Sequence, residues 1–230
     1  MIIQEIALRR TIPVIINSFN QFTHLKNIIE KFINNGFCNI YVIDQGSSYP
    51  PLIEYLSSVN ANLPQVLPIY LQKNNGPRWF LEQSLHEMFA SECVIFTDPD
   101  MVFDELSENF VSRLLQLSHK YQIAKVGSAL SLTNVNDSTI KFEEKQYNVH
   151  EWESQFWTAP IEENVYSAAI DTTFHLFNKK YYANGLFYRA LRVAGDGFEM
   201  QHAPWMINDP MPAAEKNFYK QSKTTWGWWT

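Results

Sequence analysis

Cysteine is scarce in this sequence, since only Cys38 and Cys93 occur among its 230 residues. Two cysteines form no disulfide framework and no zinc motif, and both lie beside apolar, strand-like runs as small core residues do. The short, mixed and charged N-terminus lacks the pattern of a signal peptide. No apolar run approaches the ~18 residues that a membrane-spanning helix requires. These absences predict a cytoplasmic protein.

Positive charge is also in short supply. Eighteen Lys and Arg residues face 24 Asp and Glu residues, which leaves a formal net charge of −6. Nucleic-acid binders carry a basic stripe, so no nucleic-acid partner is expected. A nucleotide ligand would need local help from a metal ion or from a well-placed Arg or Lys. The hydrophobic content of 46% is ample for a core and argues against disorder.

Strand and helix patterns alternate through the first half of the chain. Apolar runs predict strands at residues 12–17, 39–44, 66–71, 93–97 and 124–129. Helical spacing predicts helices at residues 22–33, 52–59, 79–90 and 106–121. Repeated strand–helix–strand units predict an α/β fold with a Rossmann-like, mainly parallel sheet flanked by helices.

The second half has a different character. Residues 131–145 are polar and loop-like, whereas residues 168–177 form a strand-like run with Asp171 in the middle. No internal repeat and no linker separates the halves. We therefore predict a single domain over residues 1–230, with two functional halves.

The apolar run at residues 93–97 stops at Asp98-Pro99-Asp100. In an extended backbone, side chains at i and i+2 point to the same side, roughly 7 Å apart. Pro99 lacks an N–H group, so the strand is expected to end there. Carboxylates suit Mg²⁺ or Mn²⁺, which usually serve phosphates. Asp-Pro is also a good turn initiator, so a plain turn explains the same residues.

Polar residues follow two other predicted strands. Asn17 and Ser18 come after the first strand, and Asp44 ends the second. In a doubly wound sheet, these ends share one edge with Asp98 and Asp100. Asp44 fits two roles equally: accepting hydrogen bonds from a ribose or base, or capping the turn at residues 46–48.

The third predicted strand leads into Asn74-Asn75-Gly76-Pro77-Arg78. Gly76 permits close approach of the backbone to a ligand. Arg78 has the geometry to clamp a phosphate with two hydrogen bonds. The alternative is an ordinary loop with an exposed arginine.

Taken in order, residues 12–20, 42–48, 75–77 and 97–100 resemble the nucleotide-sugar half of glycosyltransferases with the GT-A fold. The similarity is greatest to the bacterial family 2-like enzymes. It covers about residues 12–130 and, more loosely, the rest of the chain. It implies a GT-A type fold, with a nucleotide-sugar half at about residues 1–130 and a smaller acceptor half at about residues 131–230.

The resemblance implies a role for each matching position. It assigns the base and ribose to Asn17, Ser18 and Asp44, and the neighbourhood of the nucleotide to Asn75, Gly76 and Arg78. Asp98 and Asp100 would bind Mn²⁺ or Mg²⁺ on the diphosphate, with Asp100 the more direct ligand. Such enzymes often use a late histidine as a further metal ligand, and His202 is the best match. A core hydrogen bond or a surface position is the alternative for His202.

The general base is less clearly marked. Family 2 members often carry a Glu-Asp pair in the acceptor half, and no such pair follows Asp100 here. Asp171, Asp196 and Glu199 are the candidates. Asp171 ranks first because an unpaired carboxylate in an apolar run is costly. Its alternative roles are a buried cap or a salt bridge with Arg192. Inverting chemistry is favoured, with retention left open.

Tryptophans are frequent in the second half. Trp152, Trp157 and Trp205 either stack on acceptor sugars or pack in the core. The terminal residues Trp226, Trp228 and Trp229 either fold over the acceptor site, pack on the core, or make peripheral membrane contact near a lipid-linked acceptor.

The sequence therefore predicts a metal-dependent glycosyltransferase of the hexosyltransferase type. Its donor would be a nucleotide sugar, namely a UDP-sugar. Its acceptor would be a hydroxyl of a glycan or lipid-linked glycan, and the reaction would belong to polysaccharide biosynthesis. A non-catalytic sugar- or nucleotide-sugar-binding protein of the same fold is one alternative. A sugar-phosphate nucleotidyltransferase is another, but it would require a Gly-rich, Arg-containing loop at residues 17–21.

Overall fold

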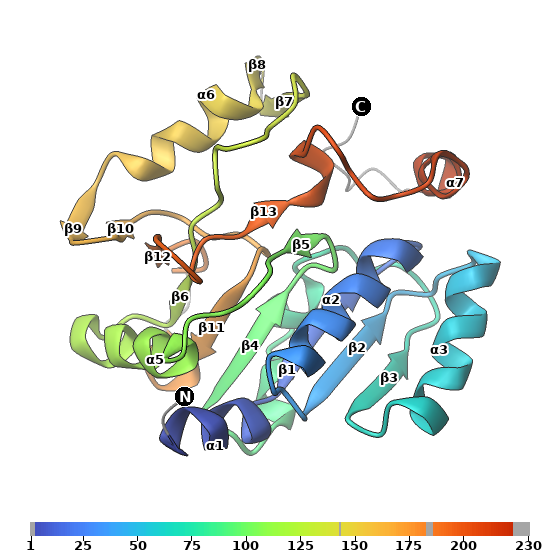
Figure 1. The fold of residues 1–230 in the computed structure, drawn as a ribbon, viewed down its shortest axis with the longest axis horizontal. Coiled ribbons are helices and arrows are strands. Elements are labelled where there is room, and N and C mark those ends of the chain that lie inside the picture. Colours follow the sequence, from blue (N-terminus) through green and yellow to red (C-terminus); the bar gives the residue numbers. More distant parts are fainter. Residues whose placement is uncertain (1–2, 143, 183–185, 223–230) are drawn as a thin grey trace.

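A nine-stranded sheet forms the centre of the protein, whose computed structural model describes residues 3–142, 144–182 and 186–222 (Figure 1). The strand order is β3-β2-β1-β4-β11-β6-β12-β10-β9. The strands are β1 (Val14–Ser18), β2 (Ile40–Asp44), β3 (Val66–Tyr70), β4 (Cys93–Thr97), β6 (Lys125–Ser128), β9 (Pro160–Glu162), β10 (Val165–Ser167), β11 (His175–Asn178) and β12 (Ala190–Val193). β10 and β11 are antiparallel to the other seven strands, which are parallel to one another. The predicted α/β fold with a mainly parallel sheet is confirmed.

Helices cover both faces of this sheet because its strands alternate their side chains. In β1, Val14 and Ile16 join the larger apolar cluster, and Ile15 joins the smaller one on the opposite face with Phe80. The α-helices are α1 (Ile3–Thr11), α2 (Phe22–Asn34), α3 (Pro50–Asn62), α4 (Trp79–Glu82), α5 (Phe110–Tyr121), α6 (Val149–Ser154) and α7 (Ala213–Ser222). Short 3₁₀ turns are η1 (Leu85–Met88), η2 (Gln155–Trp157), η3 (Lys179–Tyr181) and η4 (Ala203–Trp205).

Two small antiparallel pairs complete the fold. β5 (Met101–Val102) pairs with β13 (Gln201–His202), and β7 (Thr139–Phe142) pairs with β8 (Lys145–Asn148). Figure 1 shows β13, α6, α7 and the β7–β8 pair beyond the carboxyl ends of the parallel strands. Parts of the second half of the chain therefore lie over the edge at which ligands bind in such sheets.

Two sequence predictions were wrong in their element type. The predicted helix at residues 79–90 is split into α4 and η1, because Ser84 adopts a left-handed conformation with φ 55°. The predicted strand at residues 168–177 begins only at His175. Its apolar signal arises because Ile170 and Phe174 are fully buried from a loop, and burial alone does not specify a strand.

Two further elements were not expected. The N-terminal residues form α1, where Glu5 is buried and bonds the backbone N–H groups of Val111 and Ser112 at the start of α5. Residues 131–145 were expected to be a loop but contain β7. The α1 helix depends on contacts with α5, which lies far along the chain. The β7 strand depends on pairing with β8 across a hairpin.

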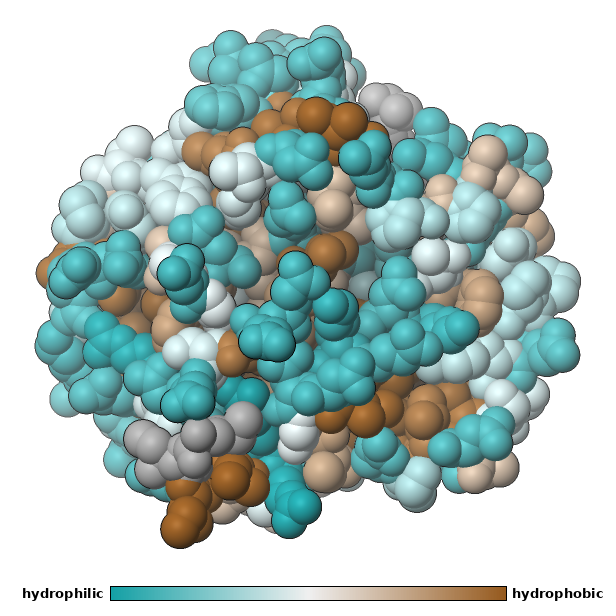
Figure 2. Space-filling model, viewed as in Figure 1, coloured by the Kyte–Doolittle hydropathy of each residue, from teal (hydrophilic) through white to brown (hydrophobic). Residues whose placement is uncertain are grey.

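The molecular surface in Figure 2 shows apolar side chains in separate groups among hydrophilic ones. Within the described ranges, no helix is both long enough and apolar enough to cross a membrane.

Candidate functional site

Three adjacent strands bring their polar ends to one edge of the sheet. β1 lies between β2 and β4, with Ser18 opposite Asp44 and Ile16 opposite Thr97. Asp98 follows directly after β4. The predicted convergence of these strand ends is therefore present in the structure, because parallel neighbours end on the same side.

The pKa values of Asp98 and Asp100 shift in opposite directions. Burial and the nearby charge of Asp100 raise the pKa of Asp98 to about 7, although Thr172 Oγ1 donates a hydrogen bond of 2.7 Å to Asp98 Oδ2. Asp100 is only 4% exposed. Burial opposes ionisation of Asp100, but the charge of His202 lowers its pKa below the ordinary value. The charge of Asp100 thus raises the pKa of Asp98, and the charge of His202 lowers the pKa of both acids.

His202 reaches this edge because of the short β5–β13 pair. Its Cα lies opposite that of Met101, and the Ala203 N–H donates a 2.8 Å hydrogen bond to the Asp100 carbonyl. The Nε2 atom of His202 lies 3.4 Å from Asp100 Oδ1. Burial opposes protonation of His202, yet Asp100 raises its pKa. The structure thus brings together two of the three predicted metal ligands.

A divalent cation suits the charge at this edge. Asp100 is buried, and its charge opposes ionisation of the half-buried Asp98 two residues before it. Oxygen donors with one imidazole are acceptable to Mn²⁺. In the described part of the chain, no three His, Cys, Asp or Glu side chains cluster closely enough to hold an ion by themselves. The protein donors fit a metal whose remaining positions are filled by a ligand or water.

Ser18 and Asp44 carry open polar atoms beside this pair. Ser18 is fully buried and Asp44 is 5% exposed. Within the described residues, Ser18 Oγ and Asp44 Oδ1 have no hydrogen-bond partner. The other Asp44 oxygen accepts from the Ser47 N–H at 3.2 Å, so the predicted turn cap also exists. Buried polar atoms that lack protein partners are candidates for ligand contacts.

Gln45 links the first and third strand ends, a role that the sequence interpretation missed. Its side-chain amide donates to Asn17 Oδ1 at 2.7 Å, and its Oε1 accepts from the Asn75 N–H at 3.0 Å. Gly76 has φ 95°, a conformation that favours glycine. Gln45 directly follows Asp44 at the end of β2, and this position was the sequence signal that could have predicted its role.

Arg78 and Asp171, predicted in separate roles, form an ion pair. Arg78 Nε donates to Asp171 Oδ1 at 2.7 Å, and Arg78 Nη2 donates to Oδ2 at 2.5 Å. The Arg78 guanidinium also lies 5.2 Å from the centre of the Tyr188 ring. Asp171 therefore pairs with Arg78 and not with Arg192, the partner considered from the sequence. Arg192 instead bonds Glu153.

Lys125 positions the segment that carries Asp171. Its Nζ atom donates to the carbonyls of Ile170 and Asp171, at 3.3 Å and 3.0 Å. Thr172, the next residue, bonds Asp98. Asp171 consequently lies at the same edge as the Asp98–Asp100 pair, and its charge contributes to the raised pKa of Asp98. A lysine at the start of an apolar strand was the only sequence signal for this anchor.

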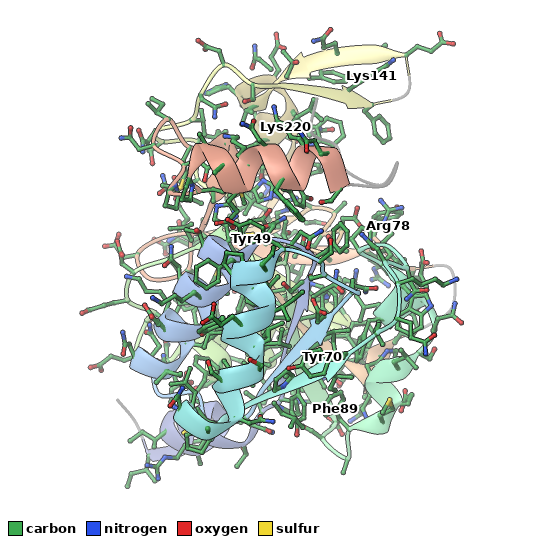
Figure 3. The ribbon with its side chains drawn as sticks, turned by 90° about the vertical axis from the view of Figure 1, so that its right-hand side faces the viewer. Tyr49, Tyr70, Arg78, Phe89, Lys141 and Lys220 are labelled. Carbon is green, nitrogen blue, oxygen red and sulfur yellow. The ribbon has the colours of Figure 1, made fainter. Side chains whose placement is uncertain are left out.

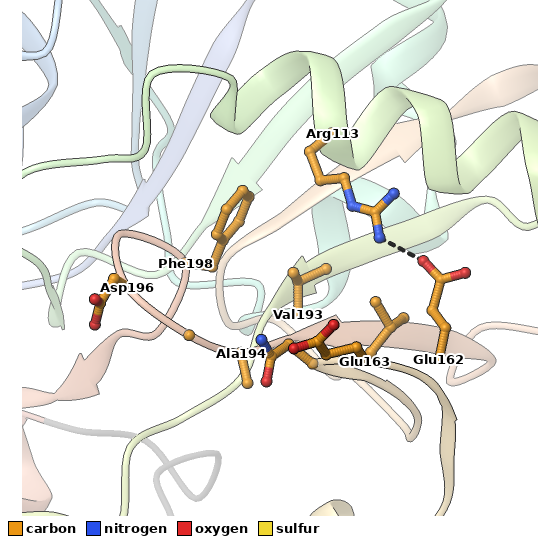
Figure 4. A pocket seen from close by; sticks show the side chains of 10 residues that line it. Arg113, Glu162, Glu163, Val193, Ala194, Asp196 and Phe198 are labelled. Atoms are coloured by element: carbon orange, nitrogen blue, oxygen red, sulfur yellow. Dashed lines mark hydrogen bonds and ion pairs between the residues drawn. The ribbon is translucent and has the colours of Figure 1, made fainter.

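Asp196 lies elsewhere. It is exposed in the loop after β12 and lines a pocket of about 450 Å³ together with Arg113 and Glu162 (Figure 4). Within the described residues, the polar partners given for Asp98, Asp100 and Asp171 do not include Asp196. Glu199 accepts a 3.0 Å hydrogen bond from the Gly195 N–H, which closes the same loop.

The second half of the chain returns to the strand-end edge through α7. Glu215 accepts from the Thr23 N–H at 2.9 Å and from Thr23 Oγ1 at 2.6 Å, at the start of α2. Phe218 packs on Tyr49 with ring centres 4.9 Å apart. Figure 3 shows α7, labelled at Lys220, above Tyr49 at this end of the sheet.

The tryptophans considered for acceptor binding contact protein rings. Trp152 packs against Tyr147, Trp157 against Tyr166, and Trp205 against His202 at a centroid distance of 4.5 Å. Trp205 therefore supports the predicted metal ligand. The terminal tryptophans Trp226, Trp228 and Trp229 lie outside the described residues.

Comparison with known proteins identifies the architecture. No protein-family model matches the sequence, and a search of curated proteins found no match. Among solved structures, GalNAc-T7 with UDP, GalNAc and Mn²⁺ is similar over 84% of this chain and 44% of that one, with 12% identity and a TM-score of 0.55. The chain has the GT-A fold.

Two other glycosyltransferases match this GT-A chain at TM-scores of 0.49 and 12% identity over 84% of its length. They are the mannosyltransferase PcManGT from Pyrobaculum calidifontis with GDP-Man and Mn²⁺, and the 1–349 fragment of S. aureus TarS. The chain covers 56% and 60% of them, so it spans little more than half of their length. At 12% identity, the likeness to GalNAc-T7 establishes the GT-A fold alone.

Proposed function

We propose that this protein is a metal-dependent glycosyltransferase that moves a sugar from a UDP-sugar to a hydroxyl of a glycan or lipid-linked glycan. The observation that carries the proposal is the Asp98–Asp100 pair, with Asp100 buried beside His202, next to the open polar atoms of Ser18 and Asp44. A nucleoside diphosphate has the phosphates that a bound cation serves and the ribose hydroxyls that could satisfy those polar atoms. GalNAc-T7, which shares the fold, was solved with UDP, GalNAc and Mn²⁺.

Asp98, Asp100 and His202 are the residues that would hold Mn²⁺ or Mg²⁺. When bound there, the cation would neutralise the charge that develops on the diphosphate leaving group. Asp100 would act as the more direct ligand, since His202 favours its ionised form. Asp98 must lose its proton to ligate, which a nearby positive charge favours.

The other strand-end residues would position the donor and acceptor. Asn17, Ser18 and Asp44 would bind the base and ribose, while Asn75 and Gly76 would lie against the nucleotide. In an inverting transfer, Asp171 would accept the proton of the acceptor hydroxyl. That oxygen would then bond to the anomeric carbon as the bond from this carbon to the diphosphate breaks. Asp196 remains a candidate from the sequence alone.

Titration with nucleotides tests this function. UDP, GDP and dTDP are added to the wild-type protein with Mn²⁺ or with EDTA, and binding is measured by calorimetry. We expect UDP to bind and Mn²⁺ to tighten it. Asp100→Asn should abolish the metal dependence and nearly all turnover, because it removes a carboxylate from the ligand set.

The matched control is Asp104→Asn. Asp104 is a nearby aspartate with a side chain 94% exposed, paired with Lys31. This variant should keep the metal dependence of the wild-type protein. Equal UDP affinity with Mn²⁺ and with EDTA would contradict the proposal. Metal-dependent binding without turnover on any acceptor would favour the non-catalytic alternative.

A further inference from the structure

The ion pair between Arg78 and Asp171 joins the nucleotide half to the acceptor half. We propose that Arg78 changes partner when the donor binds: its guanidinium moves from the Asp171 carboxylate to the donor diphosphate. Asp171 is then free to accept a proton from the acceptor hydroxyl. This inference rests on the proposed function, because it requires a nucleoside diphosphate at this edge. It gives Asp171 two states, a masked one without donor and an open one with donor.

The geometry explains the masked state. Both oxygens of Asp171 accept from the same guanidinium, at 2.7 Å and 2.5 Å. A carboxylate held in this way has its charge neutralised and its oxygens occupied, so it is a poor acceptor for the proton of a hydroxyl. Asp171 cannot act on an acceptor until the guanidinium has moved.

The pair is open enough to be exchanged. The side chains of Arg78 and Asp171 are 30% and 34% exposed, so a ligand can reach both from solvent. Ion pairs at such partly exposed positions contribute little to stability. A diphosphate offers the same fork-shaped acceptor geometry with a greater negative charge. The guanidinium therefore has an alternative partner as soon as the donor arrives.

The two partners are anchored unequally. The main chain of Asp171 is held by Lys125, which donates to its carbonyl at 3.0 Å, and by Thr172, which donates to Asp98 at 2.7 Å. Both described side-chain hydrogen bonds of Arg78 go to Asp171. When the pair opens, the arginine side chain moves and Asp171 stays beside Asp98. This asymmetry converts donor binding into exposure of a fixed carboxylate.

Charge at the edge gives the exchange its direction. Asp44, Asp98 and Asp100 already place three acids there, and an anionic donor must be balanced by cations. Lys125 is 1% exposed and bound to carbonyl groups, so it cannot follow the ligand. Arg78, whose side chain is 30% exposed, is a cation of this cluster that can move to the ligand. Its transfer to the diphosphate lowers the repulsion on the donor and leaves both Asp171 oxygens open to the acceptor.

The test compares UDP and uridine, both with Mn²⁺, by calorimetry. Asp171→Asn should bind UDP about two- to fivefold more tightly than the wild-type protein, the scale of a partly exposed ion pair, since it releases Arg78 in advance. Its turnover should nevertheless fall by ~10²-fold, because the proton acceptor is lost. Affinity for uridine, which has no phosphate, should not change. Arg78→Gln should weaken UDP binding about tenfold, and Arg78→Lys should weaken it less.

The double variant separates exchange from general charge effects. In the Arg78→Gln background, Asp171→Asn should no longer tighten UDP; a persistent gain would overturn the exchange. Arg113 and Glu162 form a similar pair, 28% and 20% exposed, away from the strand ends. Glu162→Gln is therefore the matched control and should leave UDP affinity unchanged.

The outcomes distinguish this inference from the function on which it rests. UDP binding that is unchanged or weaker in Asp171→Asn would refute the exchange and leave the proposed function intact. Failure of UDP, GDP and dTDP to bind the wild-type protein would refute both.

Discussion

Burial and neighbouring charges shift the pKa values of several side chains in this protein. Asp98 and Asp100 are two residues apart, yet their pKa values shift in opposite directions because only Asp100 faces His202 closely. Lys125 is 1% exposed, and burial lowers its pKa to about 7. A lysine with this environment anchors a loop through its hydrogen bonds and carries an electrostatic cost at neutral pH.

Lys125 should make stability depend on pH. An unfolded lysine titrates near ~10.4, so above the folded pKa of about 7 the unfolded chain binds more protons at this group. The contribution of Lys125 to the free energy of unfolding therefore rises with pH, by at most about 1.4 kcal/mol per pH unit. Urea unfolding of the wild-type protein and of Lys125→Met, from about pH 7 to pH 8.5, measures it. The stability of the wild type relative to the variant should increase over this range, and a constant difference would contradict the assignment.

At the scale of elements, β6 and β11 approach each other unusually closely at Gly127. A Cβ atom added there would lie 2.1 Å from the Phe174 carbonyl oxygen and 2.8 Å from the His175 Cβ. Phe174 precedes β11 and ends the loop that carries Asp171 and Thr172. The close approach at Gly127 thus sets where this loop meets the site edge.

Gly127→Ala should therefore destabilise the protein by ~3 kcal/mol, since a backbone carbonyl cannot move aside as a side-chain end can. Gly36→Ala is the control: Gly36 has φ +86°, but nothing lies within 4 Å of its added Cβ, so only backbone strain of ~1 kcal/mol is expected. Urea denaturation compares the two. Equal losses of stability in the two variants would show that the Phe174 carbonyl can move away from the added Cβ, and would contradict the prediction.

At the scale of the whole molecule, the end of the chain stabilises its beginning. Glu215 in α7 is 1% exposed and bonds Thr23 at the start of α2. Asp209 bonds His24 at 2.9 Å and Lys216 at 3.0 Å. The segment that leads toward the terminal tryptophans is therefore attached to α2 in the first half of the chain, close to the site edge.

Deleting residues 224–230 should leave UDP and Mn²⁺ binding intact and weaken acceptor transfer or membrane association. The reason is that three tryptophans in four residues form an interaction surface if exposed, while the predicted nucleotide contacts belong to other parts of the sequence. Donor hydrolysis, acceptor transfer and thermal unfolding are compared for the full and shortened chains. A large fall in melting temperature, with hydrolysis and transfer reduced in equal proportion, would instead indicate a purely structural tail.

Local patterns in the sequence were sufficient for the first four strands of the sheet. β4 was predicted at its observed bounds, and β1, β2 and β3 differ from prediction by at most two residues at either end. Buried strands and amphipathic helices signal themselves over a few residues, and parallel order places their ends at one edge. The carboxylates at residues 98 and 100 could therefore be recognised from the sequence alone.

Only the tertiary structure decided how the two halves meet. The pairing of Arg78 with Asp171 spans 93 positions, and His202 reaches Asp100 through a two-residue strand pair. No short-range pattern encodes such contacts, because they depend on where a loop returns after a long excursion. The same reason explains residues 168–174, whose apolar side chains are buried from a loop and not from a strand. Sequence determined which groups could act, and folding over long distances decided which groups meet.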